Sequence, residues 1–295
     1  MKYQPVGNYE VFSWSIAGNE TCVGVRAGGL RVAFDMGFAP LPLIECDHVF
    51  VSHGHADHIG AITQHMKKRR LNGLPKAVYY MPECLVEHMH TVCKAFAAMS
   101  ELDEDNEYAC TLVSMLPRSR IKISDRWSVE AVETDHAVKS LGYLLYRSYP
   151  NSDPYAEIAY LALPRFSCTP YQSLTSPHSH SLLTALGDSR FSFIQNALNN
   201  CPDLLTVQLL IMEATFLDQP QKLLERAQKH GHTHLQEIRQ HASLFKSVAN
   251  LYLIHFSARY DENHIEQLIR SNLPGWLALR VVPSLRAQRV LALDF

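Results

Sequence analysis

The chain has 295 residues, of which 47% are hydrophobic and 19% charged, a composition that excludes an intrinsically disordered protein. Its formal net charge of −2 provides no overall positive field to attract nucleic acid or an anionic membrane. The seven cysteines form no Cys-x-x-Cys pair, no stretch is long and uncharged enough to span a bilayer, and the N-terminal stretch lacks the layout of a secretory signal. We therefore expect an intracellular protein of the cytoplasm or nucleus, without a disulfide framework.

The first half of the chain is predicted to form strands separated by two helices. Segments with β-rich composition and glycines at turns predict the strands, and apolar residues at helical spacing predict the helices. The segment 48–53 has an uninterrupted apolar centre, Val49–Val51, which is typical of a strand in a sheet that is covered on both faces. The predicted strands are 9–16, 21–37, 48–53, 76–82, a hairpin over 119–136, and 141–148; the predicted helices are 58–73 and 83–99.

The second half repeats this succession after an irregular segment. Residues 149–180 are punctuated by proline, serine and tyrosine, and predict an arm-like insertion. Strands, helices and strands in each half predict an α/β fold: an αββα sandwich in one domain over residues 1–295. The later predicted strands are 181–188, 204–215, 250–260, 280–284 and 288–295, and the later helices are 235–249 and 261–273.

A string of three histidines and one aspartate follows the apolar strand 48–53. In HGHADH, the side chains of His53, His55, Asp57 and His58 sit between a strand end and a helix start. Imidazole nitrogen and carboxylate oxygen together suit Zn²⁺, with Mn²⁺ or another transition metal as the alternative. The competing interpretation is a polar loop with an acid near a helix N-terminus. The whole string favours the metal site over that interpretation.

Three more candidate ligands come directly after apolar strands. His136 follows SVEAVETD, Asp188 follows LLTALG, and His255 follows NLYLI. Gly187 is expected to allow a sharp turn before Asp188. Taken singly, each histidine could be a satisfied, half-buried side chain. With the first cluster they make a set of seven ligands, enough for two divalent metal ions.

These segments resemble the short-form tRNase Z (ribonuclease Z) family, closest to its plant type, within the metallo-β-lactamase superfamily. The match follows the family order over nearly the whole chain: AFDMG, VSHGHADHIGAI, ETDHAVKSLGYLLY, GDS, MEATFLD, HGHTHLQEI and LIHFSARY. MEATFLD and HFSARY are more specific to this family than the histidine string, which many hydrolases share.

The resemblance implies two metal sites and an activity. One ion would be held by His53, His55 and His136, and the other by Asp57, His58 and His255, with Asp188 bridging them. The implied enzyme is a binuclear metal-dependent endoribonuclease that removes the 3′ trailer from precursor tRNA by metal-hydroxide attack on the phosphodiester. The family also implies a homodimer, in which the RNA-binding surface of one subunit serves the active site of the other.

Glu213 and His232 are candidates for protonating the leaving group, with Asp57 as a third catalytic residue. Glu213 ends an apolar strand, where a carboxylate needs a partner. The family match makes that partner His232, in a pair that protonates the leaving 3′-oxygen. The alternative is a buried glutamate satisfied by backbone N–H groups. His234 is a lesser candidate for the same role.

Several features of the chain leave other interpretations open. Residues 148–187 contain Arg165 as their only lysine or arginine, so this arm can add little affinity for RNA. A metal-dependent hydrolase of small phosphodiesters or other small esters on the same fold is the second hypothesis, and a non-enzymatic metal-binding scaffold is the third. The run MKKRR at 66–70 is either a solvated helix face or a grip for phosphate. Ser257 and Arg259 match family positions near the site.

Overall fold

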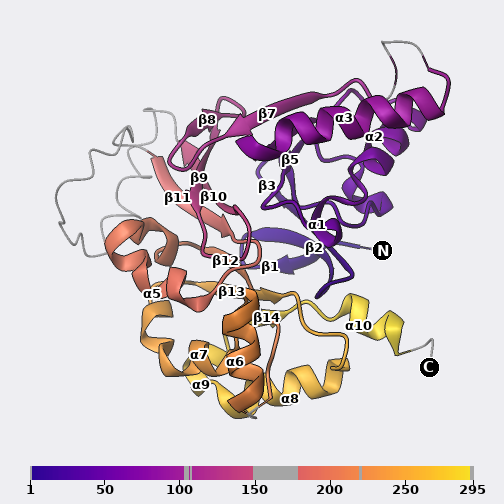
Figure 1. Cartoon of the computed structure of the whole chain (residues 1–295). Coiled ribbons are helices and arrows are strands. Elements are labelled where there is room, and N and C mark those ends of the chain that lie inside the picture. Colours follow the sequence, from indigo (N-terminus) through magenta and orange to yellow (C-terminus); the bar gives the residue numbers. More distant parts are fainter. Residues whose placement is uncertain (1, 103–105, 107, 149–178, 219–220, 293–295) are drawn as a thin grey trace.

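Two seven-stranded mixed sheets face each other in the computed structural model, which describes residues 2–102, 106, 108–148, 179–218 and 221–292 (Figure 1). The order in the first sheet is β1-β2-β3-β4-β5-β6-β7, and in the second β14-β13-β12-β11-β10-β9-β8. The first sheet contains β1 (Gln4–Val6), β2 (Tyr9–Ile16), β3 (Glu20–Ala27), β4 (Leu30–Phe34), β5 (His48–Phe50), β6 (Val78–Pro82) and β7 (Thr111–Met115). The second contains β8 (Arg120–Lys122), β9 (Trp127–Glu133), β10 (Leu141–Ser148), β11 (Ser179–Ala185), β12 (Leu209–Glu213), β13 (Asn250–Ile254) and β14 (Val281–Pro283).

The helices cover the outer faces of the two sheets (Figure 1). Helices α2 and α3 pack on the first sheet, whereas α5, α7, α8 and α9 pack on the second. A third apolar cluster, with residues of both sheets, fills the space between them. The helices are α1 (Ala56–Ile59), α2 (Ile62–Leu71), α3 (Glu83–Met99), α5 (Phe191–Asn200), α6 (Gln221–His230), α7 (Leu235–Gln240), α8 (Glu262–Asn272), α9 (Gly275–Ala278) and α10 (Arg286–Leu291), with short 3₁₀ turns at Leu41–Leu43, Pro202–Leu205 and Ala242–Phe245.

Each sheet changes from antiparallel to parallel pairing halfway across. Strands β1 to β4 are antiparallel and β4 to β7 parallel, while β8 to β11 are antiparallel and β11 to β14 parallel. The carboxyl ends of parallel strands meet at one edge of a sheet, where ligands of open α/β sheets bind. The αββα sandwich predicted from the sequence is confirmed, and the predicted insertion over 149–180 lies almost wholly outside the described residues.

The structure differs from the predicted secondary structure in several segments. The first predicted helix is divided into α1 and α2, the strand predicted over 250–260 ends at Ile254, and strand β7 and helices α5 and α6 were not predicted. Residues 288–291, predicted as a strand, lie in helix α10, which packs against β2. The helix predicted over 235–249 is broken into α7 and a 3₁₀ turn, and the strand predicted over 204–215 is reduced to Leu209–Glu213. Five of the six residues of α10, all except Val290, are good helix formers, and its buried side chains have β2 to pack on.

The MKKRR run is not a simple solvated face. The Arg69 guanidinium is buried and donates to the carbonyl oxygens of Ile44, Cys46 and Pro75 and to the Asp47 carboxylate. Lys68 Nζ donates to the Ala39 carbonyl oxygen at 2.5 Å. These two cations therefore hold the loop before β5 against α2, and they are not free to bind phosphate.

Burial of His65 predicts a loss of stability in mild acid. Its Nδ1 lies 2.7 Å from the Tyr79 hydroxyl and its Nε2 lies 3.1 Å from the Leu43 carbonyl oxygen, which satisfies a neutral ring. Burial lowers the pKa of His65 from 6.5 to about 4. Between these values the unfolded chain binds a proton that the folded protein does not, so stability falls as the pH decreases through this window.

From pH 7.5 to pH 5 this group should remove about 2 kcal/mol of unfolding free energy. Urea unfolding of wild type and of His65→Gln at both pH values measures it. Between pH 7.5 and pH 5, the loss of unfolding free energy in the variant is expected to be about 2 kcal/mol smaller than the loss in wild type. Equal losses in both proteins would contradict the assignment.

No helix among the described residues combines the length and apolar character that crossing a lipid bilayer requires.

Candidate metal centre

All seven predicted metal ligands lie at one edge of the two sheets, immediately beyond strand ends. His53, His55, Asp57 and His58 follow β5 of the first sheet. The other three follow β9, β11 and β13 of the second sheet, which run in the same direction because β10 is antiparallel to both β9 and β11. Residues 202 positions apart in sequence thus meet where the two sheets face each other. The seven are His53, His55, Asp57, His58, His136, Asp188 and His255.

The first group of donor atoms joins His53, His55, His136 and Asp188. One ligand atom from each lies within 4.8 Å of the others. His53 Nε2 lies 2.8 Å from His55 Nδ1, which lies 3.4 Å from His136 Nε2. The three rings therefore place their nitrogens near one point, and the Asp188 carboxylate supplies a fourth donor atom there.

The second group joins Asp57, His58 and His255, again with donor atoms within 4.8 Å of one another. Asp57 Oδ2 lies 3.5 Å from both His58 Nε2 and His255 Nε2. Asp188 Oδ1 lies 3.4 Å from His58 Nε2 and 3.4 Å from His255 Nδ1. Asp188 thus faces both groups of donors.

The donor set fits divalent metal ions. His58 Nε2 is buried and has no hydrogen-bond partner among the described residues, although two carboxylates face it at 3.4 and 3.5 Å. An orphaned buried nitrogen is costly unless something else occupies its lone pair. Nitrogen and carboxylate oxygen donors in a buried, converging arrangement are the ligands that Zn²⁺ and similar ions take.

Four of the donor groups hold the protonation state that binding of a cation requires, and His58 does not. Burial lowers the pKa of His53 to about 2 and also lowers that of His136. Burial acts to raise the pKa of Asp188, but the neighbouring His255 and His58 outweigh it and lower that pKa well below its usual value. Burial likewise opposes ionisation of Asp57, whose pKa the hydrogen bond from His255 and the charge of His58 lower to about 2. Burial acts to lower the pKa of His58, but the Asp188 and Asp35 carboxylates outweigh it and raise that pKa well above its usual value. Metal binding requires ionised acids and neutral rings, so binding at His58 would displace a proton from its ring.

Asp35 supports this centre from behind, a role that the sequence analysis did not assign. Its Oδ2 lies 2.7 Å from His58 Nδ1, and it accepts hydrogen bonds from the Ser52 backbone N–H and hydroxyl. The Ser52 hydroxyl also lies 2.9 Å from His53 Nδ1. Asp35 holds a left-handed backbone conformation at φ 57°, and His255 holds one at φ 64° in the other half. An acid directly after strand β4 was the signal that could have identified it.

Replacing Asp35 by asparagine is expected to weaken metal binding about 10- to 100-fold, because the buried carboxylate no longer orients His58 and Ser52. Competition with a chromophoric chelator measures the affinity without any assay of activity. Asp47→Asn, which removes an acid paired with Arg31 and Arg69, is the matched control. Unchanged affinity in Asp35→Asn would show that this carboxylate does not position the ligands.

Glu213 and His232 form the pair that the family resemblance implied. The Glu213 carboxylate also accepts from a backbone N–H group, so both explanations given for a buried glutamate apply. Glu213 Oε1 lies 3.1 Å from His232 Nδ1 and accepts from the Ser189 backbone N–H at 2.8 Å. Its Oε2 accepts from the Thr215 hydroxyl, which also lies 3.1 Å from His255 Nδ1. Burial acts to lower the pKa of His232, but the Glu213 carboxylate outweighs it and raises that pKa to about 9.

The other two histidines of the same segment lie elsewhere. His230 is exposed at the end of α6, and buried His234 caps α7, where its ring accepts from the Gln236 backbone N–H. Of the three histidines at 230, 232 and 234, His232 is the one that contacts Glu213 among the described residues, because α6 and α7 fix the other two. His234 is not part of the cluster.

Glycines permit the close approach of the segments that carry the ligands. A Cβ on Gly187 would lie 2.3 Å from Ser52 Cβ, so this glycine is required by contact between the sheets rather than by the sharp turn expected from sequence. A Cβ on Gly231 would lie 2.6 Å from His136 Nδ1, and the Gly231 carbonyl oxygen lies 2.8 Å from that nitrogen. Gly231 thus holds His136 beside His232.

The segments MEATFLD and HFSARY, which carry most of the family resemblance, pack together. The Ser257 backbone N–H donates to the Thr215 carbonyl oxygen, and the Leu217 N–H donates to the Tyr260 hydroxyl. The exposed Arg259 places its guanidinium 5.5 Å from the centre of the Phe216 ring. These contacts hold the strand ends that carry Glu213 and His255 side by side.

Comparison with known proteins places the chain in a family. No family model matches it. The protein named tRNase Z TRZ1 of Arabidopsis thaliana is 33% identical over 286 residues, which cover 95% of this chain and 96% of that protein. The fold is shared with the metallo-β-lactamase fold protein YhfI from Bacillus subtilis, with a TM-score of 0.60 at 15% identity over 95% of this chain and 97% of that one. Human tRNase Z, short form, has a TM-score of 0.56 at 15% identity over 84% of this chain and 93% of that one.

The ligand clusters and the shared fold together indicate that the chain binds divalent metal. The identity to TRZ1 extends over almost the full length of both sequences. The chain therefore belongs to the tRNase Z family, hydrolytic endoribonucleases on the metallo-β-lactamase fold.

Proposed function

We propose that the protein is a binuclear metal-dependent endoribonuclease that removes the 3′ trailer from precursor tRNA. The observation that carries this proposal is the position of Asp188, which groups with His53, His55 and His136 and whose Oδ1 also lies 3.4 Å from both His58 Nε2 and His255 Nδ1. Two such groups that share a carboxylate are the arrangement of a two-metal phosphodiesterase. The family relationship supports precursor tRNA as the substrate.

The side chains divide the work of phosphodiester cleavage among them. Divalent ions bound at this site supply activation of water at neutral pH and neutralisation of charge on the phosphate. We assign His53, His55 and His136 to one ion, Asp57, His58 and His255 to the other, and Asp188 to both. Asp57 is also proposed as a catalytic residue because the Gly18 backbone N–H holds its Oδ2 at 3.1 Å, facing the cluster.

His232 is proposed to donate the proton that the leaving 3′-oxygen needs. Its Nδ1 is held by Glu213, so its other ring nitrogen is free to point toward a bound phosphate. Its ring lies 5.6 Å from that of His136 and 5.4 Å from that of His255, centre to centre. The proton donor therefore stands at the border of both proposed metal sites.

We also propose the identity of the metal, the oligomeric state, the number of domains and the compartment. Nitrogen-rich donor sets favour Zn²⁺, with Mn²⁺ as the alternative. The family resemblance supports a homodimer, and the core cluster shared by both sheets supports one domain over the chain. A reducing compartment, cytoplasm or nucleus, is supported by free thiols at Cys22, Cys46, Cys84, Cys93, Cys110 and Cys201.

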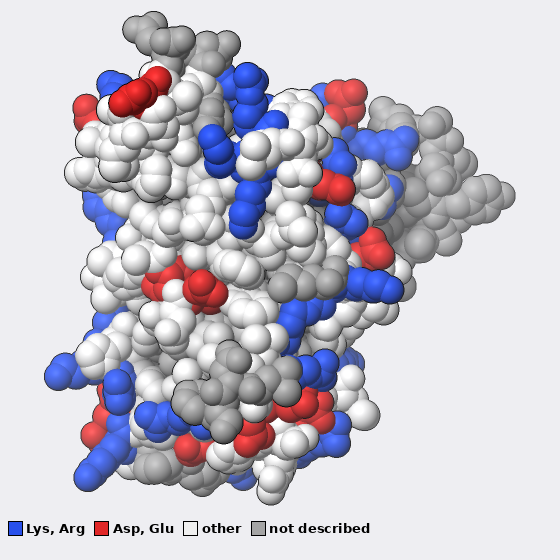
Figure 2. All heavy atoms as spheres, turned by 90° about the vertical axis from the view of Figure 1, so that its right-hand side faces the viewer, with Lys and Arg blue, Asp and Glu red and all other residues white. Residues whose placement is uncertain are grey.

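A hydrolase of small phosphodiesters is the second candidate, and the charge distribution favours it. Figure 2 shows lysine and arginine side chains scattered over one face of the molecule and interspersed with acidic side chains. This face therefore lacks one continuous basic field, and the net charge of the chain is −2.

Incubation of Zn²⁺- or Mn²⁺-loaded protein with a 3′-extended tRNA precursor tests the two candidates. We expect a single cut after the unpaired nucleotide that follows the acceptor stem, which leaves a 3′-hydroxyl, and no cut after treatment with a chelator. Asp57→Ala run in parallel should be inactive. Turnover of bis(p-nitrophenyl) phosphate without cleavage of the precursor would favour the second candidate.

A further inference from the structure

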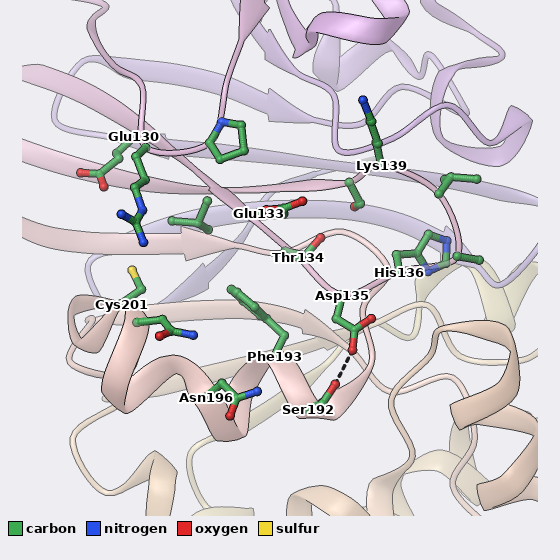
Figure 3. A pocket seen from close by; sticks show the side chains of 17 residues that line it. Glu130, Glu133, Thr134, Asp135, His136, Lys139, Ser192, Phe193, Asn196 and Cys201 are labelled. Atoms are coloured by element: carbon green, nitrogen blue, oxygen red, sulfur yellow. Dashed lines mark hydrogen bonds between the residues drawn. The ribbon is translucent and has the colours of Figure 1, made fainter.

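A cavity of about 690 Å³ opens beside His136, on the side away from the other metal ligands. Figure 3 shows it between strand β9 with the turn that follows, on one side, and helix α5, on the other. Asp135 and His136 lie at one end, and Glu130 and Cys201 at the other. Its volume falls within the range of about 300–1,000 Å³ that small-ligand sites occupy, which is room for a nucleotide.

The charges around this cavity do not suit a phosphate. Three acidic residues, Glu130, Glu133 and Asp135, line it beside only two basic ones, Arg118 and Lys139. Asp135 is already neutralised by Arg190, 2.6 Å away, and accepts from the Ser192 hydroxyl, the contact drawn in Figure 3. The exposed carboxylate of Glu133 can accept hydrogen bonds from neutral donors such as the amino groups of bases.

Its other lining groups are those that bind a nucleobase. The half-buried ring of Phe193 lies between α5 and β9, and the amide of Asn196 lies farther along the same helix (Figure 3). The hydroxyls of Thr134 and Ser140, buried in the wall, have no hydrogen-bond partner among the described residues. Unpaired bases are bound by stacking on aromatic rings and by hydrogen bonds to their edges.

The position of the cavity indicates which nucleotide it would take. His136 forms its near end, and the Gly231 carbonyl oxygen on His136 Nδ1 holds that ring next to His232. Because His232 is the proposed donor to the leaving 3′-oxygen, the cavity lies on the leaving-group side of the cut. We propose that it binds the unpaired nucleotide that bears this oxygen, with the base stacked on Phe193 and its edge against Asn196. This inference rests on the proposed function.

Precursor tRNAs that lack a single base test this. One lacks the base of the nucleotide on the 5′ side of the scissile phosphate, and another lacks the base on the 3′ side. For wild type, loss of the 5′-side base should lower kcat/KM about tenfold, the usual effect of one stacked base, whereas loss of the 3′-side base should have little effect. Phe193→Leu should cleave intact and 5′-abasic precursors at nearly equal rates, because stacking is already lost. Phe193→Tyr, which keeps the ring, should retain the tenfold preference.

Gln195→Ala is the matched control, because Gln195 is exposed on the same helix and contacts His241 outside the cavity. It should behave as wild type does. Equal cleavage of intact and 5′-abasic precursors by wild type, a stronger effect on the 3′ side, or a preserved preference in Phe193→Leu would each overturn the inference alone. Hydrolysis of bis(p-nitrophenyl) phosphate with no cleavage of any precursor would overturn the proposed function, and this inference with it.

Discussion

Asp188→Asn is expected to lower kcat for phosphodiester hydrolysis on the order of a thousandfold, about 4 kcal/mol of transition-state stabilisation. Its Oδ1 lies 3.4 Å from His58 Nε2 and from His255 Nδ1, and its Oδ2 lies 3.7 Å from His232 Nδ1. An amide of the same size carries no charge and offers one acceptor atom in place of two. The protein should also hold less metal, which elemental analysis of the purified variant measures.

The near-isosteric change keeps the prediction separate from a folding defect, which circular dichroism would reveal. Asp125→Asn, whose carboxylate is 99% exposed and pairs with Lys122, should retain full activity and metal content. Normal metal content and a rate within tenfold of wild type in Asp188→Asn would show that this carboxylate does not bridge two ions.

His232→Ala is expected to lower cleavage of precursor tRNA by about a hundred- to ten-thousandfold, the usual contribution of a positioned general acid. The ribose 3′-oxygen is a poor leaving group that needs a proton. A p-nitrophenolate leaves without one, so the same variant should keep most of its hydrolysis of bis(p-nitrophenyl) phosphate. The measurement that tests this is the loss of rate on precursor tRNA divided by the loss of rate on bis(p-nitrophenyl) phosphate.

Glu213→Gln should show the same dependence on the leaving group, because Glu213 Oε1 holds His232 Nδ1 at 3.1 Å. The double variant should lose little more than His232→Ala alone, since residues that act as one unit are not additive. Equal losses on both substrates would instead assign His232 to metal binding, where Asp188 and His255 also lie close to it.

The internal similarity of the two halves explains why one site can be assembled from segments far apart. Each sheet has an antiparallel half and a parallel half that share one central strand, β4 in the first sheet and β11 in the second. Each sheet also has a residue with positive φ directly after one of its parallel strands, Asp35 in the first and His255 in the second. A left-handed residue turns the chain abruptly beyond the sheet edge. The site therefore lies where two similar edges face each other.

The amino-acid sequence alone was sufficient for the fold class and for the candidate ligands. Strand ends are recognisable because apolar runs stop abruptly. A histidine or aspartate at such a position, as at His53 or Asp188, is not needed for packing and therefore indicates a functional site. The same local signals predicted the pairing of Glu213 with His232 through the family resemblance. They failed for residues 288–291, where helix or strand depended on what the segment packs against.

Only the tertiary structure decided which residues act together. Asp35, which follows β4, contacts Ser52 and His58 in the segment that follows β5, and no local pattern encodes those contacts. The sequence left Arg69 as a solvated or phosphate-binding cation, whereas in the structure its buried guanidinium donates to the Ile44 and Cys46 carbonyl oxygens before β5. The cavity beside His136 likewise arises from the distance between β9 and α5. Periodicity reports which face of an element is buried, whereas convergence in space depends on how the elements pack.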